Sequence, residues 1–288
     1  MPANSYEIIK GPPPLSWKEY KASVSRDWQK LLATAGLNER HFQRFLERHP
    51  GLVPSPFGHH RLADHLIAQP EIITIPRRKF PDFMWLAGTS AEVLPTLIEI
   101  EHPSKPSRKS TSNELSAQFN QALQQVSSWR ALLDDPTNAQ LFLRTYGIDE
   151  AKRNGRPVHF RYILIYGRRE TNPSPEFTAI RATLQRADEQ VMTFDRLSLS
   201  HDWNYCPTVQ RKTSKDAVHY RVLCIPACWT IGPTNARWVA SVRGLDAAIR
   251  SNPLISSERQ EFLISRIPYW KAWAATDSHE PISLAHSE

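Results

Sequence analysis

The sequence predicts an α/β fold in which a mixed central sheet is flanked by helices, with an N-terminal helical arm and a C-terminal extension. Three observations support this class. Apolar residues recur at helical spacing through residues 16–49. Runs rich in β-branched and aromatic residues follow between residues 71 and 101, and helix-like and strand-like segments then alternate to about residue 200. The 288 residues, 40% of them hydrophobic, are enough to bury a sizeable core.

Two helices are expected at the N-terminal end. Residues 1–15 should form a flexible or extended arm, because the prolines at 12–14 cannot continue a helix. Ser16 is a suitable N-cap for a helix through about Ala35, since its hydroxyl can accept a hydrogen bond from a backbone N–H of the first turn. A second helix should begin near Asn38 and end at His49, before a Pro-Gly pair.

Strands and helices are then expected in alternation. The runs EIITIP, KFPDFMWLAG and LPTLIEIE predict three strands between Glu71 and Glu101. A loop at 103–112 should lead into a helix from about Asn113 to Leu133. Beyond it the sequence predicts a buried strand, a helix, and a short strand that leads into a further element, in the order VHFRYILIYG, PEFTAIRATLQRADE and QVMTFDRLSL.

The charge distribution indicates a class of partner, and the cysteine content indicates a cellular location. Residues 151–250 hold 16 Lys and Arg against 8 Asp and Glu, which suits a polyanionic partner, although a solvated basic surface has the same composition. Three cysteines are too few for a disulfide framework, so a cytoplasmic location is expected. No apolar run approaches the roughly 20 residues that a membrane-spanning helix needs.

Acidic residues gather on the two strands that flank residue 90. Residues 88–91 have turn composition, and a hairpin centred there places Asp82 opposite Glu99. Residues two apart in a strand share a face, so Glu101 should lie beside Glu99, with the neighbouring isoleucines on the other face. Opposed carboxylates repel one another unless a cation intervenes, and Mg²⁺ binds a few carboxylates and water. The hairpin therefore predicts a divalent-metal site, with a solvent-facing acidic edge as the alternative.

The segments FPDF and LIEIEHP resemble the PD-(D/E)xK nuclease signature, with Asp82 as its first acid and Glu99 as its second. Over about residues 36–200, the order of elements is also similar to that of the Shedu family of bacterial anti-phage nucleases. The similar segments are HFQRFLERHPGLVP, PDF, IEIEHP, NELSAQFNQALQQVSSWR, ILIYGR and VMTFDRLSL. The resemblance implies a restriction-endonuclease-like fold and Mg²⁺-dependent hydrolysis of DNA, with Mn²⁺ as a substitute metal. It implies that Asp82, Glu99 and the Ile100 carbonyl hold the metal.

The chain departs from the family pattern at Glu101. The family ends its second strand with Glu-x-Lys-x-Pro, whereas residues 99–103 read Glu-Ile-Glu-His-Pro. A lysine there would orient the attacking water and stabilise the developing negative charge. Glutamate can instead act as a general base or as a further metal ligand. Alternatively, Lys105 reaches back into the site, or catalysis is lost and a nuclease-derived DNA-binding or sensing module remains.

Further site residues are expected around this hairpin. The resemblance points to Glu47 as an extra acid directed at the metal, and to Gln121 or Gln125 on the helix after the second strand. Amides there can bind a phosphate or a water molecule without adding negative charge. Basic residues should contact the DNA backbone. These are Arg77, Arg78, Lys105, Arg168 and Arg169.

The chain divides into three predicted parts: an N-terminal arm and helix (1–35), a nuclease-like domain (36–204) and a C-terminal extension (205–288). The extension is rich in aromatic residues and is interpreted as additional core or as the contact area of a homo-oligomer. The expected partners are DNA, as a duplex or at its ends, and further copies of the chain, with no membrane partner.

Overall fold

A mixed sheet forms the centre of the protein. The computed structural model describes residues 7–55, 60–73, 78–112, 114–148, 153–169, 175–184, 186–200, 205–213, 218–276 and 286–288. Within these ranges, nine strands form one sheet. In sheet order they are β11 (Val242–Arg243), β10 (Val218–Cys224), β9 (Thr208–Thr213), β2 (Leu66–Ala68), β5 (Phe83–Gly88), β6 (Val93–Ile100), β7 (Arg161–Ile165) and β8 (Glu189–Met192), with β1 (His60–Arg61) paired to β5.

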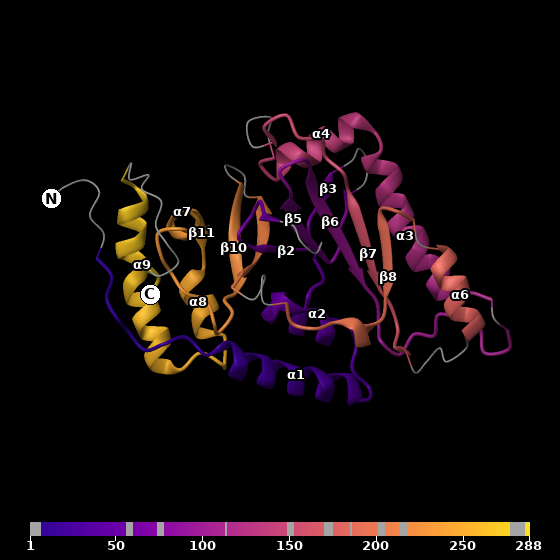
Figure 1. Cartoon of the computed structure of the whole chain (residues 1–288), viewed down its shortest axis with the longest axis horizontal. Coiled ribbons are helices and arrows are strands. Elements are labelled where there is room, and N and C mark those ends of the chain that lie inside the picture. The colour runs from indigo at the N-terminus through magenta and orange to yellow at the C-terminus, as the bar shows by residue number, and fades with distance from the viewer. Residues whose placement is uncertain are drawn as a thin grey trace.

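Helices flank this sheet, so the predicted α/β class is confirmed. They are α1 (Trp17–Ala33), α2 (Glu39–Arg48), α3 (Ala117–Leu133), α4 (Pro136–Thr145), α6 (Pro175–Leu184), α7 (Ala236–Ser241), α8 (Leu245–Arg250) and α9 (Ser257–Ala274). Figure 1 shows α3 and α6 beside the β8 end of the sheet, and α7, α8 and α9 beside the β11 end. Helix α1 runs along the lower side of the sheet in that view.

The two N-terminal helices form where the sequence predicts them. Helix α1 begins with a capping box, in which the Ser16 hydroxyl accepts the Glu19 N–H and the Glu19 side chain binds back to Ser16. Residues 7–15 before it form neither helix nor strand, and they pack on α9, where Arg259 donates to the Pro12 carbonyl; residues 1–6 of the predicted arm lie outside the described residues. Trp28 of α1 then contacts the rings of Phe42 and Phe194, which joins both helices to the core.

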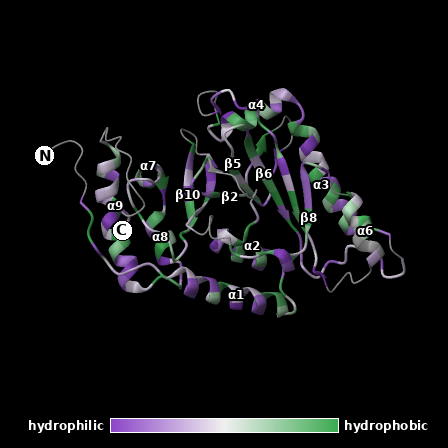
Figure 2. Ribbon diagram, in the orientation of Figure 1, coloured by the Kyte–Doolittle hydropathy of each residue, from purple (hydrophilic) through white to green (hydrophobic). Residues whose placement is uncertain are grey.

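The hairpin of β5 and β6 has the predicted register. Phe83 pairs with Ile98 and Gly88 with Val93, so the turn falls at residues 89–92 and Asp82 lies next to the Glu99 position. Both strands are buried along their whole length, because the sheet is covered on both faces. Figure 2 shows hydrophobic residues concentrated on these central strands. On its other edge, β6 pairs with β7 in parallel, and β7 pairs with β8 in parallel.

Several boundaries differ from the sequence prediction. Helix α3 begins at Ala117 rather than near Asn113, since Ser116 is the N-cap and accepts the Phe119 N–H. Helix α4 and strand β2 were not predicted. Of the run from Glu71 to Pro76, residues 72–73 form β3 (Ile72–Ile73), which pairs with β4 (Arg78–Lys79), and residues 74–77 lie outside the described ranges. Two short 3-10 helices, η1 (Pro50–Leu52) and η3 (Phe194–Arg196), follow α2 and β8.

The C-terminal third of the chain extends the same sheet. Strand β9 runs parallel to β2, with Ile67 beside Val209, and β10 and β11 follow outward. Helix α9 holds residue Glu288 through Arg266 and Trp270. The predicted boundaries at residues 35 and 204 stay predictions, although the sheet continues across the second of them. None of the helices that the structure describes is both long enough and apolar enough to cross a membrane.

Two valine-to-aspartate substitutions test whether residues 205–288 fold together with the rest. Val209 on β9 is fully buried, whereas Val218 at the start of β10 is 50% exposed. Val209→Asp should lower the free energy of unfolding by more than about 3 kcal/mol because it buries an unpaired charge, and Val218→Asp should lower it by less than about 1 kcal/mol. Denaturant unfolding followed by tryptophan fluorescence and circular dichroism measures both. Two transitions, only one of them shifted by Val209→Asp, would identify an independent C-terminal domain.

Candidate active site

The acidic residues of the hairpin meet at the end of β6. Asp82 comes directly before β5, and its Oδ2 accepts the Ile100 N–H at 2.8 Å. The next N–H, that of Glu101, donates to the Ile165 carbonyl of β7. Because the C=O and N–H of a trans peptide point in opposite directions, the Ile100 carbonyl faces away from β7, toward the side where Asp82 lies. The backbone therefore presents a carbonyl oxygen on the Asp82 side of the strand.

Asp82, which is partly buried, and Glu99, which is buried, form a pair of carboxyl groups. Burial raises the pKa of both, and the neighbouring charge of Asp82 raises that of Glu99 further. The Ile100 N–H and a hydrogen bond with Glu99 act in the opposite direction on Asp82, but burial outweighs them. Glu99 is only 7% exposed. The pair thus holds protons more tightly than isolated carboxyls do.

Glu99 has an unusual set of partners for a buried acid. Its Oε1 accepts a hydrogen bond from the amide of Gln125, and its Oε2 is buried without an N–H or hydroxyl donor among the described residues. The other group that hydrogen-bonds with Glu99 is the Asp82 carboxyl itself. The two other buried glutamates that the structure describes each have an arginine: Glu189 has Arg130, and Glu288 has Arg266. Of the three buried glutamates that the structure describes, Glu99 is therefore the one whose charge is not matched by an arginine.

The structure separates the two candidate glutamines of α3. Gln125 is half-buried and reaches Glu99, whereas the side chain of Gln121, one turn earlier, lies on the exposed surface. The sequence alone left both open, because Gln121 and Gln125 are one turn apart on the same face of the helix. The contact with Glu99 identifies Gln125 as the amide that belongs to the acidic site.

Glu101 is held by a lysine from the following loop. Lys105 Nζ forms an ion pair with Glu101 Oε2 and lies 3.8 Å from Glu39 Oε2. Partial burial lowers the pKa of Lys105, but the hydrogen bond and charge of Glu101 and the charge of Glu39 outweigh it and raise this pKa. The ammonium is therefore fixed between two carboxylates, at the position where the loop leaves β6.

The acid that α2 contributes to this site is Glu39. Its pKa is raised by burial and by the charge of Glu101, and its own charge raises the pKa values of Asp82 and Glu99. Glu47, the acid of α2 singled out from the sequence, lies eight residues further along, which is about 12 Å in an α-helix. Burial raises the pKa of Glu47, and its charged neighbours are arginines of its own helix. Sequence reasoning missed Glu39; its place in the first turn of a predicted helix was the available signal.

The predicted DNA-contacting residues have different surroundings. Arg168 forms an ion pair with Asp195, whose other oxygen accepts the backbone N–H of Arg169. The Arg169 residue itself is exposed. Arg78 forms an ion pair with Glu71. Arg77 lies outside the described residues, and Lys105 has the partners given above.

The acids fit one divalent cation through two carboxylates rather than three. Among the described residues, no three His, Cys, Asp or Glu side chains are placed to bind one metal ion together. Mg²⁺, however, is commonly bound through one or two carboxylates, with water and phosphate oxygens completing its shell. Asp82, the free Oε2 of Glu99 and the Ile100 carbonyl are such a set of oxygen ligands. The residues present therefore fit Mg²⁺ or Mn²⁺.

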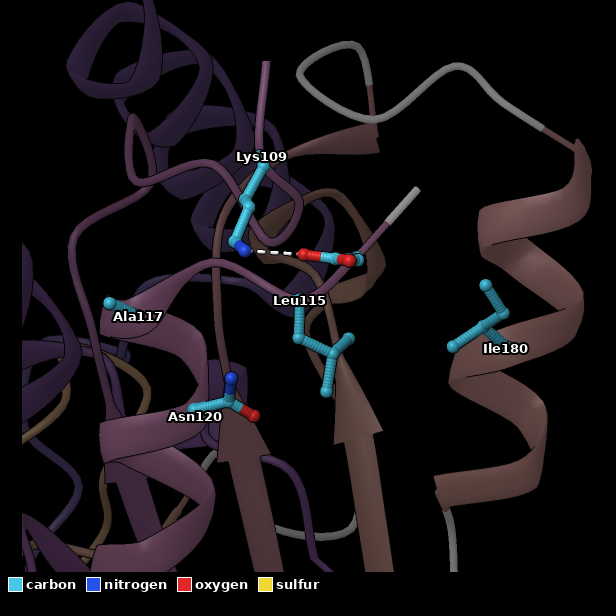
Figure 3. Close-up of a pocket in the computed structure, with 6 residues that line it drawn as sticks. Lys109, Leu115, Ala117, Asn120 and Ile180 are labelled. Carbon is cyan, nitrogen blue, oxygen red and sulfur yellow. Dashed lines mark hydrogen bonds and ion pairs between the residues drawn. The ribbon is translucent and has the colours of Figure 1, made fainter. Parts of the chain in front are cut away.

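An open groove lies elsewhere on the surface. It has a volume of about 790 Å³ and is lined by Lys109, Glu114, Leu115, Ala117, Asn120 and Ile180. Figure 3 shows Ile180 of α6 facing Leu115 across the gap, with Lys109 at one side. Lys109 forms an ion pair with Glu114. None of its lining residues is one of the four acids of the site. The groove is thus distinct from the carboxylate cluster.

The comparison with known proteins covers this region. Residues 36–198 match the family model described as Shedu protein SduA, C-terminal, which is more than half of the 288-residue chain. The matched region contains each residue of the acidic site described above and ends before β9. No curated protein matches the chain.

The buried acid pair predicts how stability depends on pH without metal. A carboxyl whose pKa is higher in the folded state binds more protons there than in the unfolded state, so the free energy of unfolding falls as pH rises through that interval. For Asp82 and Glu99 the fall should begin near the ordinary carboxyl pKa, about 4. Asp82→Asn should remove about 1 kcal/mol or more of this fall. Urea unfolding in chelator across this range is the measurement.

Glu114→Gln is the control for this experiment. The hydrogen bond and charge of Lys109 lower the pKa of the exposed Glu114 carboxyl, so its small contribution is lost as pH falls, which is the opposite sign. The control should therefore keep the wild-type fall at rising pH. A wild-type protein whose stability does not fall over this interval would contradict the buried pair.

Proposed function

The chain belongs to the Shedu family of anti-phage defence proteins, and from this premise we propose that it is a metal-dependent DNA endonuclease. The observation that carries the proposal is the buried pair Asp82 and Glu99, with one Glu99 oxygen left without a donor from the described residues. Such a pair is unfavourable in a protein interior, and a bound cation would relieve it. The other buried glutamates that the structure describes, Glu189 and Glu288, each pair with an arginine, so a buried glutamate without an arginine is specific to this site.

Asp82 and Glu99 would hold one Mg²⁺ or Mn²⁺ ion together with the Ile100 carbonyl. Two contacts prepare these oxygens: the Ile100 N–H orients Asp82, and Gln125 occupies Glu99 Oε1 so that Oε2 is left for the ion. The chemistry that a bound divalent ion supplies is neutralisation of charge at the scissile phosphate and a lower pKa of the attacking water.

Glu101 is the proposed general base. Its side chain is 15% exposed, which leaves its carboxylate within reach of solvent water. It would accept the proton of the attacking water as the new P–O bond forms and the P–O bond to the leaving oxygen breaks. Lys105, paired with Glu101, would bring beside the phosphate the positive charge that the strand lacks.

DNA is the proposed substrate and partner. Arg169, exposed just after β7, and the excess of basic residues between 151 and 250 would contact the phosphate backbone. Arg168 would bind the phosphate backbone while it keeps its ion pair with Asp195. The DNA would be bound either as a duplex or at its ends. The chain would also assemble into a homo-oligomer, which would bring two sites to the two strands.

A second function is favoured by one observation at Glu101. The residue that stands in place of the family's lysine is already neutralised by an ion pair with Lys105. A site whose base is occupied in this way suits a module that binds or senses DNA without cutting it. The two functions share the fold and the basic surface, and they differ in whether the phosphodiester bond is broken.

Cleavage assays with supercoiled DNA test the endonuclease proposal. Wild type should nick the plasmid in Mg²⁺ or Mn²⁺, and Asp82→Ala should reduce the rate by at least about 100-fold because the metal loses a ligand. Arg169→Ala should raise the DNA concentration that cleavage requires, and it should reduce the salt dependence of DNA binding. Cleavage that persists unchanged in Asp82→Ala would contradict the assignment. If wild type is inactive, binds DNA, and gains activity in Glu101→Lys, the binding module is the correct function.

Metal binding can be measured without substrate. Repulsion between close, partly solvated carboxylates costs on the order of 1 kcal/mol per pair, and a cation that binds only the folded state stabilises it by mass action. Millimolar Mg²⁺ or Mn²⁺ should therefore raise the melting temperature of wild type. Glu99→Gln should keep or raise the metal-free melting temperature and abolish the metal effect. A wild type insensitive to both metals would rule out this site.

A further inference from the structure

We propose that Glu39 is a positioning residue of the acidic site, which holds the Lys105 ammonium against Glu101. Its catalytic consequence rests on the proposed endonuclease function, whereas the contact itself has a readout that needs no substrate. Glu39 lies at the start of α2, more than 40 residues before Asp82, and neither the family pattern nor the hairpin assigns it a role.

The geometry that supports this role is a single cation between two carboxylates. Lys105 Nζ binds Glu101 and lies 3.8 Å from Glu39 Oε2, and the side chain of Lys105 is 32% exposed. Lysine carries its charge on a flexible four-carbon stem, so one ion pair leaves the ammonium several rotamers. A second carboxylate, 3.8 Å from the ammonium, restricts it to the position next to Glu101. Glu39 thus supplies the second constraint.

An acid in the first turn of a helix has a simpler explanation, which is its favourable interaction with the helix dipole. That interaction favours the ionised form and so lowers a carboxyl pKa. Here burial and the charge of Glu101 raise the pKa of Glu39 instead. The surroundings of Glu39 therefore disfavour its negative charge. Lys105 is the group that most strongly opposes this effect, because its positive charge lowers the pKa of Glu39. Stabilisation of the helix alone does not account for the position.

His102 explains why Glu39 and Glu101 meet. Its Nε2 contacts the Leu37 carbonyl oxygen at 2.7 Å, which joins the residue after Glu101 to the turn that precedes Glu39. Its Nδ1 accepts the Ser104 N–H at 3.1 Å, which leaves Nε2 as the ring nitrogen that faces the carbonyl. The ring also packs edge-on against Phe42 of α2. One imidazole thereby fixes both the end of β6 and the start of α2.

This arrangement bears on how an anionic substrate approaches. Asp82, Glu99, Glu101 and Glu39 together would repel a phosphodiester, and Lys105 is the cation that the described structure places among them. An ammonium held at a fixed point favours charge that develops in the transition state, because it needs no reorganisation during the reaction. Loss of Glu39 should therefore affect the turnover number more than the affinity for DNA.

The contact is tested by the reactivity of Lys105 toward an amine-acylating reagent, followed by peptide mass spectrometry. Lys109 forms a matched exposed pair with Glu114 in the same loop and serves as the internal reference. Glu39→Gln should increase the acylation of Lys105 at least about threefold with Lys109 unchanged, since a released ammonium deprotonates and reacts more readily. Glu114→Gln should do the reverse, with Lys109 more reactive and Lys105 unchanged.

Glu39→Asp separates positioning from helix stabilisation. Aspartate keeps the negative charge at the helix start. Its side chain is one methylene shorter, so the carboxylate lies farther from Lys105. Lys105 should become more reactive in this variant too, and the turnover number in the nicking assay should fall about tenfold in both variants with little change in KM. Circular dichroism confirms that each variant is folded.

The outcomes distinguish the two proposals. If Lys105 keeps its wild-type reactivity in Glu39→Gln and Glu39→Asp but gains reactivity in Glu101→Gln, Glu39 does not position it and the inference is overturned. If wild type does not nick DNA, the proposed function fails, and the acylation of Lys105 still decides whether Glu39 holds the lysine. Reactivity that rises in both Glu39 variants supports the inference in either case.

Discussion

The pairing of β5 with β6 is the constraint on which the site depends. Both strands are buried throughout, so a slip of one residue would exchange the side chains of the two faces and disrupt the close packing on each of them. The fixed register brings Asp82 beside Glu99 and directs the Ile100 N–H to the Asp82 carboxylate. Once this backbone is set, each neighbouring element adds one group: α3 adds Gln125, and α2 adds Glu39.

The buried glutamates have two kinds of hydrogen-bond partner. Glu189 and Glu288 are neutralised by arginines and hold elements together, with Arg130 linking α3 to β8 and Arg266 fixing Glu288 to α9. Glu99 has a neutral amide and a neighbouring acid instead. The first arrangement stabilises the fold when the charge is properly hydrogen-bonded, and the second does so only when something else binds. Stability is thus given up locally at the end of β6, where the rest of the core is apolar.

Local signals predicted much of this architecture. Ser16 and Asn38 mark the starts of α1 and α2, and the turn composition near residue 90 was sufficient for the hairpin register. What failed depends on contacts distant in sequence. The three-residue strand β2 is defined by its partners on both sides, and no local pattern decides between Glu39 and Glu47, because the direction from which α2 approaches β6 is fixed by His102. The same holds for Gln121 and Gln125, which share a helix face until Glu99 is placed.

The parallel pair of β2 and β9 has a consequence for the order in which the protein is made. Leu66 lies beside Thr208, about 140 residues later in the chain, so one edge of β2 lacks its partner until those further residues have been synthesised. Residue Gln69, which follows β2, donates its N–H to the Asp82 carbonyl, so the frame around the acids borders on this late pairing. Contacts between such distant segments form slowly because the intervening loop must first be closed. A nascent chain therefore carries the acidic hairpin before it carries β9, and the sheet beside the hairpin is completed only after residue 208 has been made.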